Sequence, residues 1–191
     1  MSNRIQLLSQ CEASEKSQQL LSQVQAKFGS VPNVFKMMSN SSAVLQSYLS
    51  FSQALSEGQL CPQIQERIAL AIAEENGCEY CLAAHSAIAK KTGLSEEEIQ
   101  LARQGQSEDQ RAQAAIKFAK SVFLYSGDVK DFELEVVREA GFSDEEILEI
   151  VAAVSLNVLT NSLNNVARTK LDFPEAKELA GCGCNCGCGC S

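Results

Sequence analysis

The sequence of 191 residues has no tryptophan, a single histidine and only three prolines. It has no cluster of lysine or arginine and a formal net charge of −8, so a nucleic acid is not expected as a partner. Long hydrophobic runs are also missing. The longest, residues 68–73 and 150–154, are far too short to span a membrane. The first residues show none of the signals of an export peptide, and we therefore expect a cytoplasmic protein.

Apolar residues recur with helical spacing, and a sustained alternation typical of strands is absent, which predicts an all-α fold. The length suits one hydrophobic core rather than two domains. We expect a helical domain over residues 1–180 and a flexible tail of glycine and cysteine over residues 181–191. The helices we expect cover residues 14–28, a short segment with Pro32 in its first turn, residues 42–55, two segments between Pro62 and Gly93, and residues 107–125 and 143–166.

Two parts of the chain repeat each other at an offset of 48 residues. Residues 92–99 and 140–147 both contain a glycine that ends a helix, followed by serine with glutamate three residues later. This pattern predicts a capping box at the start of the next helix. We infer a duplicated helical hairpin whose second copy lacks the chemistry of the first, since Ser126, Val129 and Glu133 match Cys78, Cys81 and His85.

The candidate functional residues lie between Glu66 and His85, the single histidine. If the segment after Gly77 is helical, Cys78, Cys81 and His85 share one helix face. Two thiols and an imidazole form the parts of a thiol redox site: an attacking thiolate, a resolving thiol and a base. Glu66 precedes an apolar run that predicts a helix buried nearly all round, which places its carboxylate at the edge of a dry region.

This arrangement indicates a division of roles. Cys81 lies near a helix N-terminus and one turn before His85, and both features favour its thiolate. Attack on a peroxide would give a sulfenic acid at Cys81, and Cys78 would condense with it to a disulfide. Glu66, if it reaches His85 or Cys78, would orient the imidazole or relay a proton.

Other interpretations of the same residues remain open. Cys78, Cys81 and His85 could supply three ligands to zinc, with a fourth from Cys61, Glu66 or water. The two cysteines could also be inert core residues. Tyr80, between them, is expected to serve packing. The asparagines of the last long helix are expected to form a polar face or hydrogen bonds between helices: Asn157, Asn161, Asn164 and Asn165.

The spacing Glu66-x11-Cys78-x2-Cys81-x3-His85 resembles the alkylhydroperoxidase D and carboxymuconolactone decarboxylase family, and is closest to its AhpD-like, peroxidase-related branch. Residues 31–33, 161–169 and 172–174 also resemble that branch. The resemblance implies an all-helical AhpD-like oligomer in which Glu66, Cys78, Cys81 and His85 form a proton relay and Cys81 is the peroxidatic thiol. The implied activity is reduction of a hydroperoxide at the expense of a dithiol or protein reductant, with no cofactor in the core.

The tail carries five cysteines at alternate positions: Cys182, Cys184, Cys186, Cys188 and Cys190. Thiolates at this spacing suit a soft metal ion such as Cu(I) or zinc, so a metal-handling protein is an alternative from a different class. A flexible arm of thiols could instead reduce the Cys78–Cys81 disulfide by exchange, or have no role. A disulfide reductase without peroxidase activity is a further alternative.

Self-association is the last expectation. The apolar helices at residues 44–55 and 147–158 carry more apolar surface than one core of this size is expected to cover. We therefore expect a homo-oligomer, as the resemblance also implies.

Overall fold

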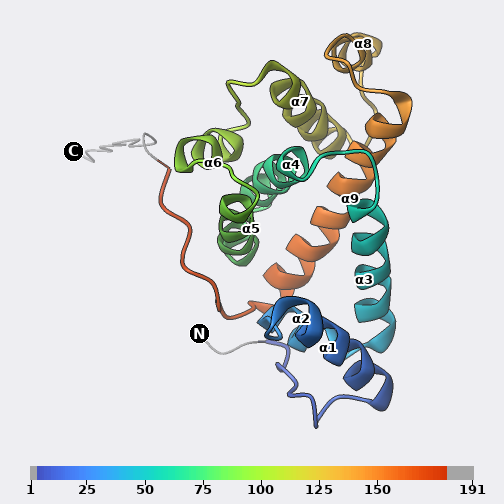
Figure 1. Cartoon of the computed structure of the whole chain (residues 1–191), viewed down its shortest axis with the longest axis vertical. Coiled ribbons are helices and arrows are strands. Elements are labelled where there is room, and N and C mark those ends of the chain that lie inside the picture. Colours follow the sequence, from blue (N-terminus) through green and yellow to red (C-terminus); the bar gives the residue numbers. More distant parts are fainter. Residues whose placement is uncertain (1–3, 180–191) are drawn as a thin grey trace, which may run out of the picture.

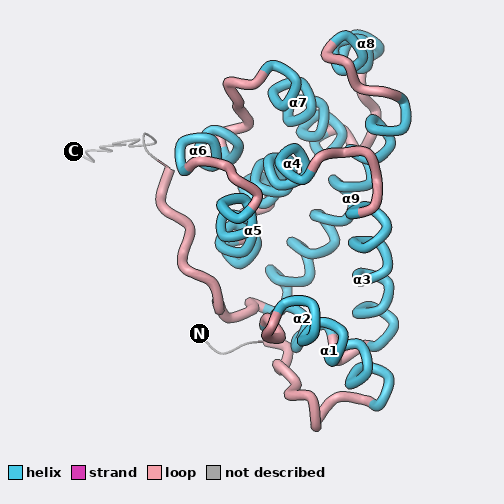
Figure 2. The backbone as a smooth tube through the Cα atoms, viewed as in Figure 1, coloured by secondary structure: helices cyan, strands magenta, loops and turns pink. Residues whose placement is uncertain are grey.

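The computed structural model describes residues 4–179, and within this range it contains helices and no strands (Figures 1 and 2). The all-α prediction is therefore confirmed. The helices are α1 (Glu15–Phe28), α2 (Asn33–Met38), α3 (Ser42–Ser56), α4 (Pro62–Glu75), α5 (Glu79–Lys91), α6 (Glu96–Arg103), α7 (Gln110–Leu124), α8 (Asp131–Glu139) and α9 (Asp144–Ala167). The tail cysteines lie outside the described residues, and their metal binding stays a prediction.

Helix α4 is the centre of the bundle. Its run Ile68–Ala73 is buried without interruption, as the sequence predicts. Successive residues of this run enter different parts of the core: Ile68 and Ile72 pack with α7 and α9, Leu70 packs with α5, α6 and α7, and Ala73 packs beside the two cysteines. A helix that is apolar on every side is stable only when other helices surround it. Helices α5, α6, α7 and α9 do so (Figure 1).

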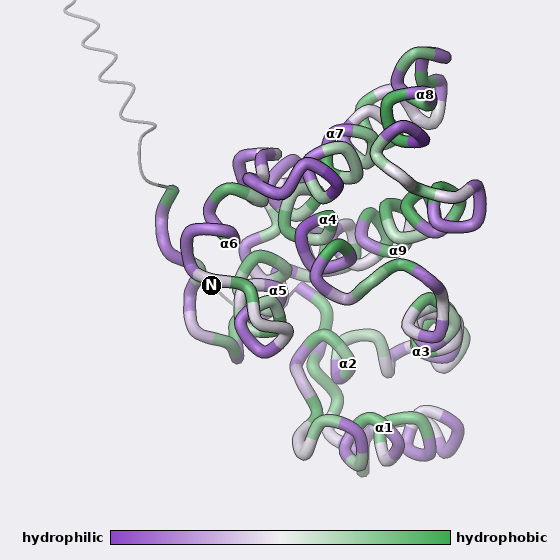
Figure 3. Tube along the Cα trace, turned by 45° about the horizontal axis from the view of Figure 1, so that its top comes forward, coloured by the Kyte–Doolittle hydropathy of each residue, from purple (hydrophilic) through white to green (hydrophobic). Residues whose placement is uncertain are grey.

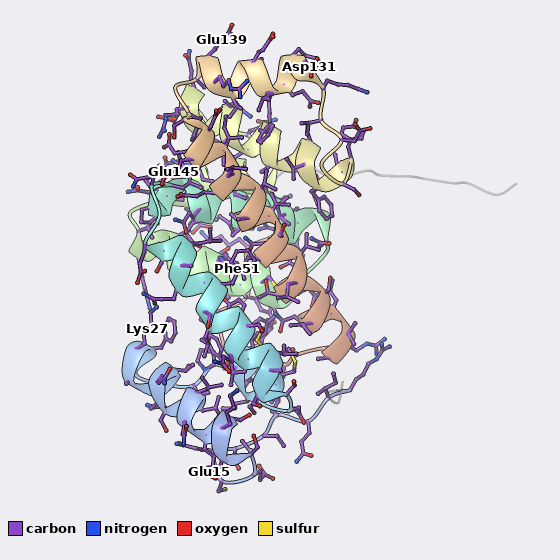
Figure 4. All side chains as sticks on the ribbon, turned by 90° about the vertical axis from the view of Figure 1, so that its right-hand side faces the viewer. Glu15, Lys27, Phe51, Asp131, Glu139 and Glu145 are labelled. Carbon is purple, nitrogen blue, oxygen red and sulfur yellow. A yellow bond between two sulfur atoms is a disulfide. The ribbon has the colours of Figure 1, made fainter. Side chains whose placement is uncertain are left out.

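The N-terminal helices form a second cluster at one end of α9. Leu21 and Val24 of α1 pack with Phe35 of α2, Leu45 of α3 and Ala167, the last residue of α9. Helices α3 and α9 lie side by side along one flank of the molecule, with α1 at one end and α8 at the other (Figure 4). The aromatic rings of this cluster border the cavity described below.

Helix α9 is the longest helix of the described residues, and its sequence is strongly apolar. By length and composition it could cross a membrane, with a mean hydropathy of 1.3 over its best window. In the structure it packs against α3, α4, α5 and α7, which makes it a core helix of the bundle. Hydrophobic residues run along much of it, whereas hydrophilic residues fill the connection between α6 and α7 (Figure 3). Its side chains Leu148, Leu159 and Val166 are exposed. They would lie in the interface of the predicted homo-oligomer.

The internal duplication is visible in the element boundaries. Helices α4 and α7 begin at residues 62 and 110, and α6 and α9 begin at residues 96 and 144, an offset of 48 in both cases. The two predicted capping boxes are present, at Ser95 with Glu98 and at Ser143 with Glu146. The copies differ at the middle helix, because α8 begins at Asp131, several residues later than the offset predicts from α5.

The local predictions need two small corrections. Pro32 was expected in the first turn of its helix, but it is the N-cap and α2 begins at Asn33. Cys78 was expected on the face of a helix, but it is the N-cap of α5, in an extended conformation. Both residues occupy the position just before a helix, where backbone N–H groups are still unpaired.

One carboxylate fixes the connection that leads into α4. Glu149 of α9 accepts hydrogen bonds from the backbone N–H groups of Gln59 at 2.9 Å and Leu60 at 2.7 Å. Gly58 lies against the same carboxylate, since a Cβ added there would approach it to within 2.5 Å. The start of α4, and with it Glu66, is thereby held against α9.

We expect Glu149→Ala to lower the free energy of unfolding by about 2 kcal/mol, because two backbone donors lose a charged acceptor. The measurement is equilibrium unfolding in urea. Glu135→Ala on α8 serves as the control, because its side chain is exposed. Equal stability of the two variants would contradict this role for Glu149.

Candidate functional site

The turn between α4 and α5 places the two cysteines. Gly77 adopts a left-handed conformation, φ 57°, which lets the chain reverse directly after α4. Cys78 then caps α5, and its sulfur accepts a hydrogen bond from the backbone N–H of Cys81 at 3.3 Å. The pair is joined as a disulfide with its Cα atoms 5.3 Å apart. The predicted redox pair is thus brought together at a helix N-terminus, where a thiolate is favoured.

Both sulfurs are deeply buried, but not equally. Cys78 has no exposed surface, whereas Cys81 is 3% exposed and lines a cavity. Cys78 packs behind it with Ala73 and Leu82. A molecule that enters the cavity therefore meets Cys81 and not Cys78, which agrees with the roles expected from the sequence.

His85 and Glu66, which are predicted to form a proton relay, lie in direct contact. The Nδ1 atom of His85 lies 2.9 Å from Oε2 of Glu66, and both side chains are mostly buried. Burial lowers the pKa of the imidazole, but the charge of Glu66 and its hydrogen bond outweigh that effect, so the pKa of His85 is raised above its ordinary value. Because Nδ1 faces Glu66, Nε2 is the atom left to exchange protons with a ligand.

The C-terminal segment after α9 closes the site from outside. Tyr80 donates its hydroxyl proton to Asp172 at 2.7 Å, and the other carboxylate oxygen of Asp172 accepts the backbone N–H of Asn33 at 2.6 Å. The ring of Tyr80 meets that of Phe173 edge to face, with centroids 5.8 Å apart. Residues 31–33 and 172–174, remote in sequence, are thus neighbours beside α5 (Figure 1).

Tyr80 was expected to serve packing, and this contact network extends that expectation. Burial, and then the hydrogen bond to Asp172, raise the pKa of its hydroxyl far above the ordinary value, so it stays neutral. Its hydroxyl also accepts the backbone N–H of Val34 at 3.2 Å. Tyr80 therefore forms a rigid wall of the site and does not titrate in the physiological range.

A cavity of about 220 Å³ opens beside Cys81 and His85. Its walls are mostly aromatic or aliphatic and come from α1, α2, α3, α5, α9 and the C-terminal segment: Phe28, Pro32, Val34, Phe35, Tyr48, Tyr80, Ala84, Ile88 and Phe173. Thr160, Asn164 and Lys91 add polar groups. A larger cavity of about 370 Å³ between α1 and α3 contains none of the four predicted site residues. The chemistry therefore belongs to the smaller, apolar cavity.

Asn164, expected from the sequence only as part of a polar face or of hydrogen bonds between helices, reaches the site. Its side-chain N–H donates to the sulfur of Cys81 at 3.4 Å, across 83 residues of sequence. Asn157 instead bonds within its own helix, to the carbonyl of Ala153. Asn165 bonds to the carbonyl of Asn76 in the turn before Cys78. The asparagines of the polar face expected for α9 thus have different hydrogen-bond partners, and the local sequence does not distinguish them.

The zinc interpretation finds no support in residues 4–179. Within that range no three His, Cys, Asp or Glu side chains are grouped so that they could hold a metal ion. Cys61, a candidate fourth ligand, caps α4 and packs against the cluster formed by α4, α7 and α9. His85 directs its Nδ1 to Glu66.

Residues 42–121 match the carboxymuconolactone decarboxylase family. A peroxidase-related protein with an alkylhydroperoxidase AhpD core, from Ralstonia eutropha JMP134, is 25% identical with a TM-score of 0.81, over 90% of this chain and 93% of that chain. A peroxidase-related protein from Silicibacter sp. TM1040 is 23% identical with a TM-score of 0.76, over 87% and 89%.

A third solved structure, the debrominase Bmp8, is 17% identical with a TM-score of 0.74, over 88% of this chain and 92% of that chain. At this identity the similarity concerns the fold alone. None of the curated proteins matches the chain significantly. The matched family region includes the whole of α4 and α5, where Glu66, Cys78, Cys81 and His85 lie. The predicted resemblance to the alkylhydroperoxidase D and carboxymuconolactone decarboxylase family is therefore confirmed over residues 42–121.

Proposed function

We propose that the protein is a thiol peroxidase that reduces organic hydroperoxides through a Cys78–Cys81 dithiol–disulfide cycle. The observation that carries the proposal is the placement of Cys81 at the wall of an apolar cavity, with Cys78 behind it and the Glu66–His85 pair beside it. Similarity to a peroxidase-related protein with an AhpD core supports the same activity.

The first step uses the reduced protein. The Cys81 thiolate attacks the terminal oxygen of the hydroperoxide, the O–O bond breaks, and the sulfur becomes a sulfenic acid. The leaving alkoxide takes a proton and departs as an alcohol. Because the pKa of His85 is raised, its protonated form is favoured, and it can supply that proton through Nε2. Glu66 holds the imidazole and stabilises its charged form.

The second step regenerates a closed disulfide. The Cys78 thiol attacks the sulfenic sulfur, and its proton leaves with the hydroxyl group as water. One hydroperoxide and two thiols thus give one alcohol, one water and one disulfide. A dithiol reductant then returns two electrons by exchange. Both sulfurs are buried, so the reductant has to enter the cavity. It is therefore a small dithiol, or a dithiol at the end of a flexible peptide segment.

The size of the cavity bears on the alternatives. A volume of about 220 Å³ admits a small organic molecule and not a folded protein, so a disulfide reductase for protein substrates fits less well. The apolar walls favour an organic hydroperoxide over hydrogen peroxide.

Bmp8 has also been crystallised as a cysteine-to-alanine variant in complex with 2,3,4-tribromopyrrole. A reductive reaction on a small aromatic molecule is the alternative activity to assay beside the peroxidase.

We expect Cys81→Ser to abolish the consumption of cumene hydroperoxide with dithiothreitol as reductant. Cys78→Ser should complete the first oxidation and then accumulate sulfenic acid at Cys81, detectable by dimedone labelling and mass spectrometry. The free cysteines Cys11 and Cys61 supply matched controls, and their serine variants should keep the rate. Trapping at Cys78 in the Cys81→Ser protein would reverse the assignment.

Glu66→Gln and His85→Ala should each slow the single-turnover oxidation by roughly a hundredfold, the usual effect of removing a general acid–base group or its orienter. Rapid mixing with hydroperoxide followed by thiol counting measures the rate. Glu74→Gln is the control, since this carboxylate of the same helix pairs with Arg103 and not with His85. Rates within a few-fold of the wild type would reduce the pair to a structural role.

The raised pKa of His85 also predicts a pH-dependent stability. The Glu66–His85 pair should stabilise the fold fully below about pH 6.5, the ordinary histidine value, and lose that contribution as pH rises through the higher folded value. Urea unfolding of the oxidised protein should therefore show a larger stability gap between wild type and His85→Gln at pH 5.5 than at pH 9. A gap that widens with pH would refute the direction of the shift.

A further inference from the structure

Asn164 occupies a position at which a polar side chain is costly. It is 4% exposed, its Oδ1 atom has no hydrogen-bond partner among the described residues, and its N–H points at a sulfur atom. One turn earlier, Asn161 is completely buried, and neither of its amide atoms finds a partner in the described part of the chain. A buried polar atom without a partner costs about 1–3 kcal/mol. An aliphatic residue at position 164 would avoid that cost, so packing alone does not account for the amide.

The contact of Asn164 has a different strength in the two redox states of the site. The sulfur of a disulfide is a weak acceptor, so the N–H of Asn164 gains little from it in the oxidised protein. A thiolate carries a full negative charge, and hydrogen bonds to ionised acceptors are about twice as strong as neutral ones. The same N–H therefore stabilises reduced, ionised Cys81 more than it stabilises the disulfide.

The other groups around Cys81 differ from Asn164 in their dependence on pH. His85 lies one turn along α5 and supports a thiolate only while it is protonated; Glu66 behind it partly cancels its charge. The hydroxyls of Tyr48 and Tyr80 also line the cavity, and burial raises the pKa of each, so both are neutral. Asp172 is bonded to Tyr80, and Lys91 lies at the cavity wall. Asn164 is a donor that does not titrate and that contacts the sulfur itself.

We propose that Asn164 is a further catalytic residue, whose amide N–H holds the anionic sulfur of Cys81 in the reduced protein and so favours the dithiol over the disulfide. The proposal deepens the function proposed above and rests on it only in taking Cys81 as the reactive thiol. Asn164 acts alongside His85 at lower pH. Its contribution persists after His85 has lost its proton.

The first test measures the thiolate without any peroxide. In a Cys78→Ser background, the rate of iodoacetamide alkylation at Cys81 is followed against pH by mass spectrometry, which separates Cys81 from the remaining cysteines. Asn164→Leu keeps the size of the side chain and removes the donor. It should raise the pH midpoint of alkylation by about one unit or more. Asn164→Asp places a carboxylate against the sulfur and should raise the midpoint further.

Asn165→Ala is the matched control, because its neighbouring amide bonds to the carbonyl of Asn76 and not to sulfur. It should leave the midpoint unchanged. If Asn164→Leu does not fold, the smaller Asn164→Ala, which also removes the donor without adding a charge, replaces it. An unchanged midpoint in the folded variants, or an equal shift in Asn165→Ala, would overturn the proposal.

The second test uses the complete cysteine pair. In dithiothreitol redox buffers, Asn164→Leu should keep a larger fraction of the Cys78–Cys81 disulfide oxidised than the wild type, with the equilibrium constant changed about tenfold. The difference should remain above the pH at which His85 deprotonates, and its loss there would contradict a non-titrating donor. A protein that shows both shifts but consumes no hydroperoxide would uphold Asn164 and refute the peroxidase. Peroxidase activity without either shift would uphold the proposed peroxidase function and refute the role of Asn164.

Discussion

The burial of α4 on every side is the constraint on which the rest of the structure depends. Its apolar run has to be enclosed by α5, α6, α7 and α9, and this requirement restricts where the polar side chains of α4 can lie. Glu66 lies two residues before the run, and its carboxylate is mostly buried. A carboxylate in such a place needs a partner. The one histidine of the sequence supplies it from the neighbouring helix.

The cavity depends on a second constraint, the return of the chain after α9. The segment that follows Arg168 runs past α2 and α5 and ends beside α6, where Arg103 donates to the carbonyl of Lys177 (Figure 1). On the way Asp172 ties α2 to α5 through Asn33 and Tyr80. The walls of the cavity are therefore supplied by both ends of the chain, although all four of the predicted site residues come from α4, α5 and the turn between them. The four predicted site residues are therefore local in the sequence, whereas much of the cavity wall comes from distant segments.

The same separation explains how far the sequence could be interpreted. Helical spacing and caps are local, so the boundaries of α1, α3, α4 and α9 and both capping boxes were predictable to within a residue or two. The Cys-x-x-Cys and histidine pattern is local too. The sequence alone could not decide whether Glu66 reaches His85, because that contact depends on how two helices pack. The contacts of Asn164 with Cys81 and of Asp172 with Tyr80 span 83 and 92 residues and have no local signature.

The duplicated hairpin shows why only one copy holds the site. In the second copy, Ala114 stands at the position of Glu66 and is buried against the core. Glu133, at the position of His85, binds Ser121 and the backbone N–H of Lys130 at the start of α8. Helix α8 packs chiefly on α7 and leaves Phe132 and Val136 exposed, so it borders water where α5 borders the core. A thiolate and an imidazole there would be solvated and screened, and the electrostatic coupling that Glu66 and His85 have in the dry copy would be lost.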